Sequence, residues 1–444
     1  KKRLLRSSVK AENSRKKLIW EEDMVNIAVL GYGTVGSGVV EVINTNHKSI
    51  NKRAGAEINI KYVLDLRDFP GDPVQEILIH DYEIIANDPE VDIVVEVMGG
   101  IEPAYTFVKR ALEAGKSVCT SNKALVAKHG PELMEIARQK DINFLFEASV
   151  GGGIPIIRPL KQCLAGNEIS DVIGIVNGTT NYILTKMCEE GMDFQEALAK
   201  ATELGYAEAD PTADIEGYDA GRKVAIMASI AFHSRVVFSD VYTEGITKIT
   251  AKDIAYAKEF DSVIKLLGAA HNTEKGIEVA VYPMMISNQH PLASVRDSFN
   301  AVFVHGDSLG DAMFYGRGAG ELPTASAIVG DVLDVVRNME YGCTGRIGCG
   351  CYRETQVKSI ADVKNKFFLR MQVTNQPGVL ASIANVFGKH KVSIERIIQK
   401  DVEKEKAELV IVTEYVKEGY LQEALDELMQ MPILEEISSK IRVY

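Results

Sequence analysis

The chain is poor in cysteine and tryptophan, and it has no long run of apolar residues. Its 444 residues include six cysteines and a single tryptophan. So few thiols in a chain of this length argue against a disulfide scaffold and favour reduced cysteines in a cytoplasmic protein. No uninterrupted apolar segment approaches the roughly 18 residues that a membrane-spanning helix needs, so a membrane protein is not indicated.

Positive charge is also in short supply. The 50 Lys and Arg are outnumbered by 62 Asp and Glu, which gives a net charge of −12. An acidic chain repels phosphate backbones, so nucleic acid is not the expected partner. The 46% apolar and 25% charged composition is that of ordinary globular domains.

The first 23 residues differ from the rest of the chain. Residues 1–20 hold eight Lys or Arg and only one acid, Glu12, and they contain Trp20. Such a segment has little to bury, so we expect residues 1–23 to be a disordered basic extension, with a transit peptide as the alternative. Met24 is the expected natural start, because an apolar strand follows it directly.

Three folded regions follow. Residues 24–150 alternate apolar strands with amphipathic helices, which predicts a doubly wound α/β domain with a parallel sheet. Residues 151–305 predict an α+β substrate-binding and dimerisation domain, residues 306–337 a turn and helix that complete the first domain, and residues 338–365 a linker. Residues 366–444 alternate strand, helix, strand, strand, helix and strand, the pattern of a ferredoxin-like module. The strands expected in the first domain are Asn26–Leu30, Ile58–Leu64, Val91–Met98, Ser117–Thr120 and Asn143–Glu147, and its clearest helices are Pro103–Ala114 and Pro131–Lys140.

A glycine-rich turn follows the first strand. Gly31, Gly33 and Gly36 form G-x-G-x-x-G, with Thr34 and Val35 between the last two glycines. In a Rossmann domain these glycines give the tight turn, the close approach to a pyrophosphate and the helix–strand packing. The motif therefore predicts binding of NAD or NADP.

Two residues after the second strand bear on the choice of cofactor. A carboxylate such as Asp65 accepts from the ribose hydroxyls of NAD, whereas an arginine such as Arg67 binds the extra phosphate of NADP. Asp65 comes later after the glycines than is usual, so an insertion is expected between them. The sequence leaves the choice open.

The segment from Ala201 to Lys223 is dense in carboxylates and ends in a lysine. Asp219 and Lys223 stand four residues apart, so on a helix they share one face. A surface ion pair is one interpretation, but the apolar residues after Lys223 predict a buried helix. A lysine held in such a cleft beside carboxylates is suited to proton transfer.

This segment, together with the turn at Gly31–Gly36 and the motif N-G-T-T-N-Y at 177–182, resembles homoserine dehydrogenase. So do Ser121-Asn122-Lys123 and the Y-G-R-G-A-G sequence at 315–320. The resemblance covers about Val25 to Arg337. It implies NAD(P)-dependent interconversion of L-homoserine and L-aspartate 4-semialdehyde, a step of threonine, methionine and isoleucine biosynthesis, by a monofunctional enzyme.

The resemblance also implies roles for single residues. Lys223 would be the acid–base residue, with Lys123 as a second lysine in the cleft and Asp219 orienting Lys223 and contacting the substrate. The substrate-binding residues would also include Glu208, Asp214, Tyr206 and Thr180. Ser121, Lys123, Gly318 and Gly320 would join the glycine-rich turn along the cofactor.

The loop from Glu147 to Ile154 resembles the monovalent-cation loop of the same family. By that match, Glu147 and the carbonyls of Val150, Gly152 and Ile154 would bind a structural cation such as sodium. A glycine-rich domain hinge is the equally weighted alternative. Cys343, Cys349 and Cys351 lack metal-ligand spacing, which favours free thiols.

The strand-to-helix turn at 373–380 resembles the ACT domain, an amino-acid-sensing module. Asn375, Gly378, Val379 and Leu380 would lie at the effector site, and L-threonine is the expected effector. A role in oligomerisation alone is the alternative. A homo-oligomer, dimer or tetramer, is expected. The competing functions are another Rossmann-type semialdehyde oxidoreductase, which would use Cys119 or Cys163, and an inactive amino acid sensor.

Overall fold

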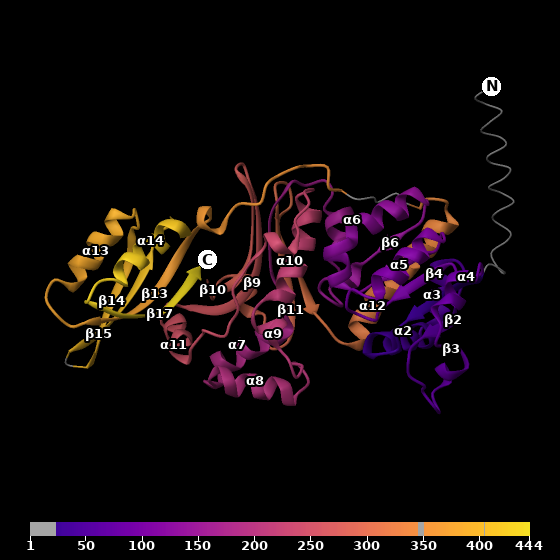
Figure 1. Ribbon diagram of the computed structural model, residues 1–444, viewed down its shortest axis with the longest axis horizontal. Helices are drawn as coiled ribbons and strands as arrows, with labels where there is room; N and C mark the ends of the chain where they lie inside the picture. Colours follow the sequence, from indigo (N-terminus) through magenta and orange to yellow (C-terminus); the bar gives the residue numbers. More distant parts are fainter. Residues whose placement is uncertain (1–23, 345–349, 404) are drawn as a thin grey trace, which may run out of the picture. The chain divides into compact units, whose positions relative to one another are not determined.

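The computed structural model describes residues 24–344, 350–403 and 405–444. The basic extension and Cys349 therefore lie outside the described residues. The chain divides into two compact units (Figure 1). Unit 1 holds the described residues up to Lys161 together with Ala319–Gly350, and unit 2 holds Gln162–Gly318 and Cys351–Tyr444. No described helix is long and apolar enough to cross a membrane.

Unit 1 is built on a parallel sheet of six strands in the order β3-β2-β1-β4-β5-β6. This is the strand order of the doubly wound dinucleotide-binding fold, which confirms the predicted fold class. The strands are β1 (Met24–Leu30), β2 (Glu57–Leu64), β3 (Leu78–Ile79), β4 (Ile93–Glu96), β5 (Ser117–Thr120) and β6 (Phe144–Leu145).

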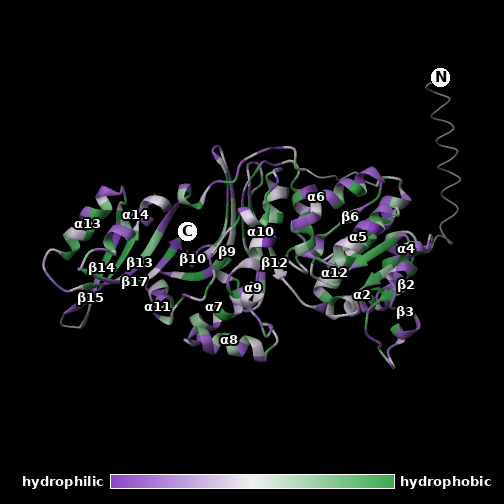
Figure 2. Ribbon diagram, in the orientation of Figure 1, coloured by the Kyte–Doolittle hydropathy of each residue, from purple (hydrophilic) through white to green (hydrophobic). Residues whose placement is uncertain are grey.

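Helices cover both faces of this sheet (Figure 1). On one face α12 packs against α2 and α3, and on the other α5 packs against α6. Because both faces are buried, the central strands β1 and β4 are mostly apolar, with Asn26 and Glu96 as the polar exceptions (Figure 2). The helices of unit 1 are α2 (Thr34–Thr45), α3 (His47–Ala54), α4 (Tyr82–Asn87), α5 (Ala104–Glu113), α6 (Lys123–Gln139) and α12 (Glu321–Glu340).

Helix α6 begins earlier than the sequence predicts. Its first turn is capped by Asn122, whose Oδ1 accepts from the Leu125 N–H at 3.1 Å, and Pro131 lies inside the helix. The expected helix start at Pro131 is therefore wrong, because the Asn122 cap, nine residues upstream, already satisfies a free amide of the first turn. The strand expected at Asn143–Glu147 is only β6, and a 3₁₀ turn, η2 (Glu147–Ser149), follows it.

Unit 2 is organised by one mixed sheet of eleven strands in the order β12-β11-β7-β9-β10-β17-β13-β15-β14 along the main path. β8 and β16 pair at its side. The strands are β7 (Ile169–Ile175), β8 (Tyr242–Thr243), β9 (Ser262–Thr273), β10 (Gly276–Ser287), β11 (Phe299–Gly306), β12 (Gly310–Arg317), β13 (Lys364–Thr374), β14 (Ile394–Glu403), β15 (Lys406–Thr413), β16 (Val416–Lys417) and β17 (Leu434–Val443).

The C-terminal part of this sheet has the expected ferredoxin-like module. Helices α13 (Val379–Lys389) and α14 (Glu418–Leu428) pack on one face of β13–β15 and β17 around a buried apolar cluster. The remaining helices of unit 2 are α7 (Gly178–Glu190), α8 (Phe194–Glu203), α9 (Thr212–Ile215), α10 (Tyr218–Ala231) and α11 (Ala251–Glu259).

The glycine-rich stretch that the sequence assigns to the first domain is divided in the structure. Residues 310–317 form β12, which pairs with β11 in unit 2, and only α12 returns to unit 1. The alternating burial of β12 marks it as the edge strand of the sheet, and such a short alternating segment has no strong sequence signal.

Candidate active site

The glycine-rich turn lies between β1 and α2 and has the geometry of a phosphate cradle. Gly31 has φ +99°, a value that favours glycine, and a Cβ at Gly36 would lie 2.0 Å from the Gly31 carbonyl oxygen. At Gly33 a Cβ would meet nothing within 4 Å, so this backbone faces open space. The exposed Gly33 caps α2 and the exposed Thr34 begins its first turn, where free amides favour an anion. Unit 1 thus fits a dinucleotide.

Asp65 and Arg67 lie against this turn as a pair. Asp65 accepts from the Tyr32 N–H at 2.8 Å and from Arg67 Nε at 3.0 Å, and Arg67 also donates to the Tyr32 carbonyl at 3.0 Å. The Arg67 guanidinium holds the pKa of the Asp65 carboxyl well below its usual range, so the carboxylate is charged. Asp65, expected to favour NAD, and Arg67, expected to favour NADP, are therefore paired beside the same turn.

A buried carboxylate that the sequence analysis does not single out organises the end of β4. Glu96 accepts from Thr120 Oγ1 at 2.6 Å and from the amides of Met98 and Gly99 at 2.9 and 3.3 Å. Burial raises the pKa of the Glu96 carboxyl. The Ser121 N–H donates to the Glu96 backbone carbonyl at 3.3 Å, so Glu96 holds the segment that leads to Lys123 at the start of α6. The sequence could have indicated Glu96, because it is a charged residue at the end of an apolar strand.

Lys223 occupies a buried position on α10 in unit 2. Its Nζ donates to Asp219 Oδ2 and to the Val176 carbonyl, each at 2.7 Å. Lys223 is 8% exposed and Asp219 3% exposed, so the pair is not a solvated surface bridge. The expected i,i+4 pairing on one helix face is therefore present, and it is buried as predicted.

Asn177 links this pair to a second carboxylate. Its Nδ2 donates to Asp219 Oδ2 at 2.9 Å and to Asp214 Oδ1 at 2.7 Å, while its Oδ1 accepts from the Thr180 N–H and hydroxyl at 2.9 Å each. The structure thus brings Asp214, Asp219, Lys223 and Thr180 together around one side chain. The sequence analysis gives Asn177 no role of its own, although it is the first residue of the motif at 177–182. Its place just before the helix that starts at Gly178 could have identified it as a helix cap.

The other acidic residues of the segment lie outside this cluster. Glu208 and Tyr206 are exposed, and the Tyr206 carbonyl accepts from Thr179 Oγ1 at 2.5 Å. Asp210 accepts from the Thr212 N–H at 3.1 Å and so supports the start of α9. Neither Glu208 nor Tyr206 is therefore part of the buried cluster around Asn177.

Gly318 and Gly320 end up in different units. A Cβ at Gly318 would lie 1.8 Å from Asn300 Nδ2, so a glycine is required there by packing within unit 2. Gly320 has φ +118° and caps α12 in unit 1.

The loop at 147–154 is anchored by its carboxylate. Glu147, which is 3% exposed, accepts from the amides of Ile156, Ile157 and Arg158 at 2.6–2.9 Å. Gly151 and Gly152 have φ +73° and +54°. No group of three His, Cys, Asp or Glu in the described ranges has metal-ligand geometry.

The described thiols differ in burial and surroundings. Cys119 is fully buried in the unit 1 core, and burial raises the pKa of its thiol well above the ordinary value. Cys163 is exposed. Cys343 and Cys351, which are among the described cysteines, lie near the Asn338 side chain and the Ser229 carbonyl.

Three family models match successive parts of the chain. Residues 31–147 match the homoserine dehydrogenase NAD-binding domain, residues 155–333 match homoserine dehydrogenase, and residues 367–432 match the ACT domain.

Whole proteins match over almost the full length. Homoserine dehydrogenases of Synechocystis and Bacillus subtilis are 44% and 41% identical over 434 and 428 residues, with 94% of this chain and 99% and 98% of theirs covered. A crystal structure of a homoserine dehydrogenase from Thiobacillus denitrificans has a TM-score of 0.90 at 38% identity, covering 95% of this chain and 98% of that one. A hyperthermophilic archaeal homoserine dehydrogenase in complex with NADPH has a TM-score of 0.60 at 28% identity and covers 70% of this chain and 97% of its own.

The dinucleotide cradle and these matches define an NAD(P)-dependent oxidoreductase with a C-terminal ACT domain. The chain belongs to the homoserine dehydrogenase family. Its activity is the interconversion of L-homoserine and L-aspartate 4-semialdehyde in amino-acid biosynthesis, and the resemblance found in the sequence is confirmed.

Proposed function

We propose that Lys223 is the acid–base residue of the homoserine dehydrogenase reaction and that L-threonine regulates the enzyme through its ACT domain. The observation that carries the first part is the buried Lys223 ammonium, 2.7 Å from both the Asp219 carboxylate and the Val176 carbonyl. Two oxygens fix the position of the ammonium, which is a donor that can give a proton to a substrate oxygen.

The bound nicotinamide dinucleotide supplies a hydride to the aldehyde carbon. Lys223 donates a proton from Nζ to the aldehyde oxygen, which becomes the hydroxyl of homoserine, and in the reverse direction Nζ takes this proton back. Asp219 and Asn177 orient Lys223. Lys123 is the second lysine of the site, at the start of α6.

The carboxylates of the segment bind the amino-acid end of the substrate. Asp214 is held by Asn177, and the exposed Glu208 and Tyr206 form the rim. Thr180, whose hydroxyl is bonded to Asn177, contributes by holding that residue. Two negative charges suit the ammonium group of homoserine.

A Lys223→Met variant tests the catalytic role. Because general acid–base catalysis contributes about 10²–10⁴-fold, kcat should fall by that factor in an assay of nicotinamide absorbance with L-homoserine. Lys116→Met is the matched control, since Lys116 is also buried but donates to the Asp88 and Val91 carbonyls in unit 1. The control should lose stability and keep kcat. Near-normal turnover of Lys223→Met would remove the proposal.

For the cofactor and the cation, the proposal stays with the sequence analysis. NADP or NAD would bind along the residues that the sequence analysis gives: Gly31–Gly36, Asp65, Arg67, Ser121, Lys123, Gly318 and Gly320. A monovalent cation would be held by Glu147 and the carbonyls of Val150, Gly152 and Ile154. The three amide bonds to the Glu147 carboxylate support a role for that residue in shaping the loop. Comparing turnover and thermal stability in sodium, potassium and choline buffers tests this.

The effector turn supports threonine binding. Asn375 and Gly378 are exposed before α13, and Val379 begins the helix, where free amides suit a carboxylate. The neighbouring Thr374 hydroxyl is buried and has no hydrogen-bond partner among the described residues. A polar amino acid would give this hydroxyl a partner.

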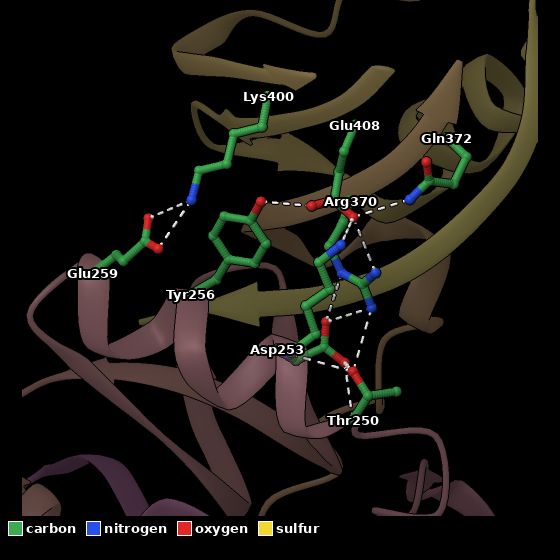
Figure 3. A network of polar contacts seen from close by, with 9 residues as sticks. Thr250, Asp253, Tyr256, Glu259, Arg370, Gln372, Lys400 and Glu408 are labelled. Atoms are coloured by element: carbon green, nitrogen blue, oxygen red, sulfur yellow. Dashed lines mark hydrogen bonds and ion pairs between the residues drawn. The ribbon is translucent and has the colours of Figure 1, made fainter. Parts of the chain in front are cut away.

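A buried polar network ties the ACT sheet to the catalytic part of unit 2 (Figure 3). Arg370 on β13 and Asp253 on α11 form an ion pair at 3.1 Å, and Glu408 on β15 accepts from Tyr256 on α11 at 2.6 Å. Helix α11 in turn packs on β9 and on α7, which begins at the Asn177 cap. This contiguous packing supports an effect of the ACT domain on the site.

Titration calorimetry with L-threonine, combined with turnover assays, tests regulation. The proposal expects binding to the wild type and altered turnover, both lost in an Asn375→Ala/Thr374→Val variant. Absence of binding would leave the oligomerisation role, which analytical ultracentrifugation of the expected dimer or tetramer would measure.

A further inference from the structure

Asn300 is a buried asparagine whose amide makes no hydrogen bond to the described part of the chain. It lies on β11 and is 1% exposed. Both its Nδ2 and its Oδ1 lack a partner. An unpaired buried amide costs stability, so a group that supplies both a donor and an acceptor is required to offset it.

The strand register places Asn300 beside the catalytic lysine's anchor. Ala301 pairs with Ile175, so the next position brings Asn300 opposite Val176, whose carbonyl accepts from Lys223. The two segments stay opposite each other past the ends of the strands, because a Cβ at Gly178 would lie 2.9 Å from the Ser298 carbonyl oxygen. Asn300 therefore lies next to the turn that carries Asn177.

Asn300 also faces the side of the sheet on which α10 lies. A Cβ at Gly268 would contact both Val224 of α10 and Val176, so the Val176 side chain points to α10. Directly opposed residues of neighbouring strands share a face, which puts the Asn300 amide on this side as well. On the other side of Asn300, Gly318 leaves room for the amide where any Cβ would collide with it.

The chemistry of the reaction limits what can lie here. Hydride transfer requires the reacting carbons of nicotinamide and substrate to approach within about 3–3.5 Å, next to the acid that protonates the substrate oxygen. The carboxamide of nicotinamide is attached to the ring carbon beside the reacting one. It must therefore lie within a few bonds of the group that Lys223 protonates.

We propose that Asn300 binds the nicotinamide carboxamide, with Oδ1 accepting from its NH₂ and Nδ2 donating to its carbonyl oxygen. A primary carboxamide offers one donor and one acceptor side by side, which is the complement of an asparagine amide. A substrate carboxylate would satisfy only Nδ2. Asn300 thereby sets the rotation of the ring and the face presented to the substrate. The assignment rests on the proposed position of Lys223.

An analogue in which acetyl replaces the carboxamide isolates the contact. The acetyl group keeps the carbonyl acceptor and lacks the NH₂ donor. Titration calorimetry gives the Kd of wild-type full-length protein for the preferred dinucleotide and for its 3-acetylpyridine counterpart. We expect the natural form to bind about 5-fold more tightly, the effect of one net hydrogen bond.

Two substitutions then test the residue. Asn300→Leu removes both atoms, so the ratio of the two Kd values should fall to about 1. Asn300→Asp keeps an acceptor of the same size, so both forms bind more weakly and the ratio is retained. The matched control is Asn338→Leu in α12, because Asn338 is also buried but its Nδ2 donates to Asn143 Oδ1 at 2.9 Å. The control should leave the ratio at its wild-type value.

A ratio that stays at the wild-type value in Asn300→Leu overturns the inference. A rise in KM for homoserine without a change in the ratio overturns it too, because Asn300 would then contact the substrate. If Asn300→Leu does not fold, Asn300→Asp carries the test, and loss of its ratio refutes the donor–acceptor assignment. A fully active Lys223→Met variant would sink the proposed site by itself. An unchanged ratio beside an inactive Lys223→Met would sink only the role of Asn300.

Discussion

Replacing Arg370 by methionine probes the network between α11 and the ACT sheet (Figure 3). Arg370 is 6% exposed and its partner Asp253 is 0% exposed. The substitution removes the ion pair to Asp253 at 3.1 Å and weaker contacts to Glu408 and Thr250 at 3.4 and 3.3 Å. Glu408 keeps a cation, because Lys252 lies 2.6 Å from it. Asp253 does not.

The cost of the substitution follows from the charge that is left. Breaking a buried ion pair by removing one partner costs about 3–5 kcal/mol. Asp253 retains bonds from the Thr250 amide and hydroxyl at 2.9 and 2.7 Å, which partly solvate it. We therefore expect the lower end, about 3 kcal/mol, and a fall of about 10 °C in the Tm of unit 2.

Scanning calorimetry and guanidinium unfolding measure this effect. Arg370→Met/Asp253→Leu should regain at least half of the loss, because no buried charge is then left without a partner. Lys400→Met is the control within the same network, since the Lys400–Glu259 pair is 44% and 50% exposed at its side chains and should contribute less than about 1 kcal/mol. A loss below about 1 kcal/mol for Arg370→Met, or a double variant as unstable as the sum of the two single ones, would refute the reasoning.

Three further outcomes are expected. Burial lowers the pKa of the Lys265 ammonium from 10.5 to about 8, so the unfolded chain binds the extra proton between these values and stability rises with pH. Wild-type unfolding free energy should thus increase by about 2 kcal/mol more than that of Lys265→Met between about pH 7.5 and 9.5; parallel curves would contradict this. Asp65→Ser should shift the kcat/KM ratio of NADP to NAD about 10-fold toward NADP, because the ionised carboxylate no longer opposes a 2′-phosphate; steady-state kinetics with both cofactors decide. Gly36→Ala should abolish dinucleotide binding in calorimetry while leaving threonine binding intact, since its Cβ would lie 2.0 Å from the Gly31 carbonyl oxygen.

The sequence predicts best what depends on neighbouring residues. The turn at Gly31–Gly36 and the pair Asp219–Lys223 are local patterns, and the structure places both as expected. The strands β1 and β5 are also found close to their predicted bounds. Here periodicity and helix caps carry enough information, because the partners are a few positions apart.

Contacts between segments that are distant in the sequence could not be predicted from it. Asn300 acquires its place only because β11 lies between β7 and β12, and Arg442 meets Glu244 across 198 positions of sequence. The prediction at Pro131 failed for a local reason. Proline is typical of a helix start, but the cap at Asn122 begins the helix further upstream. Strand order and register are set by global packing, which no local pattern reports.

The eleven-stranded sheet of unit 2 has one narrow seam, and this has a mechanical consequence. β10 and β17 share only the pairs Met284–Arg442 and Met285–Val443, followed by the Tyr444 amide bond to the Met285 carbonyl at 2.9 Å. Side chains reinforce the seam, because Arg442 bonds Glu418 and Glu244 at 2.7 Å each. The sheet is therefore expected to separate first between β10 and β17. Under tension or in hydrogen exchange, the two halves would behave as separate cooperative blocks, joined at the seam by Arg442 and beside it by the polar network between α11 and the ACT sheet.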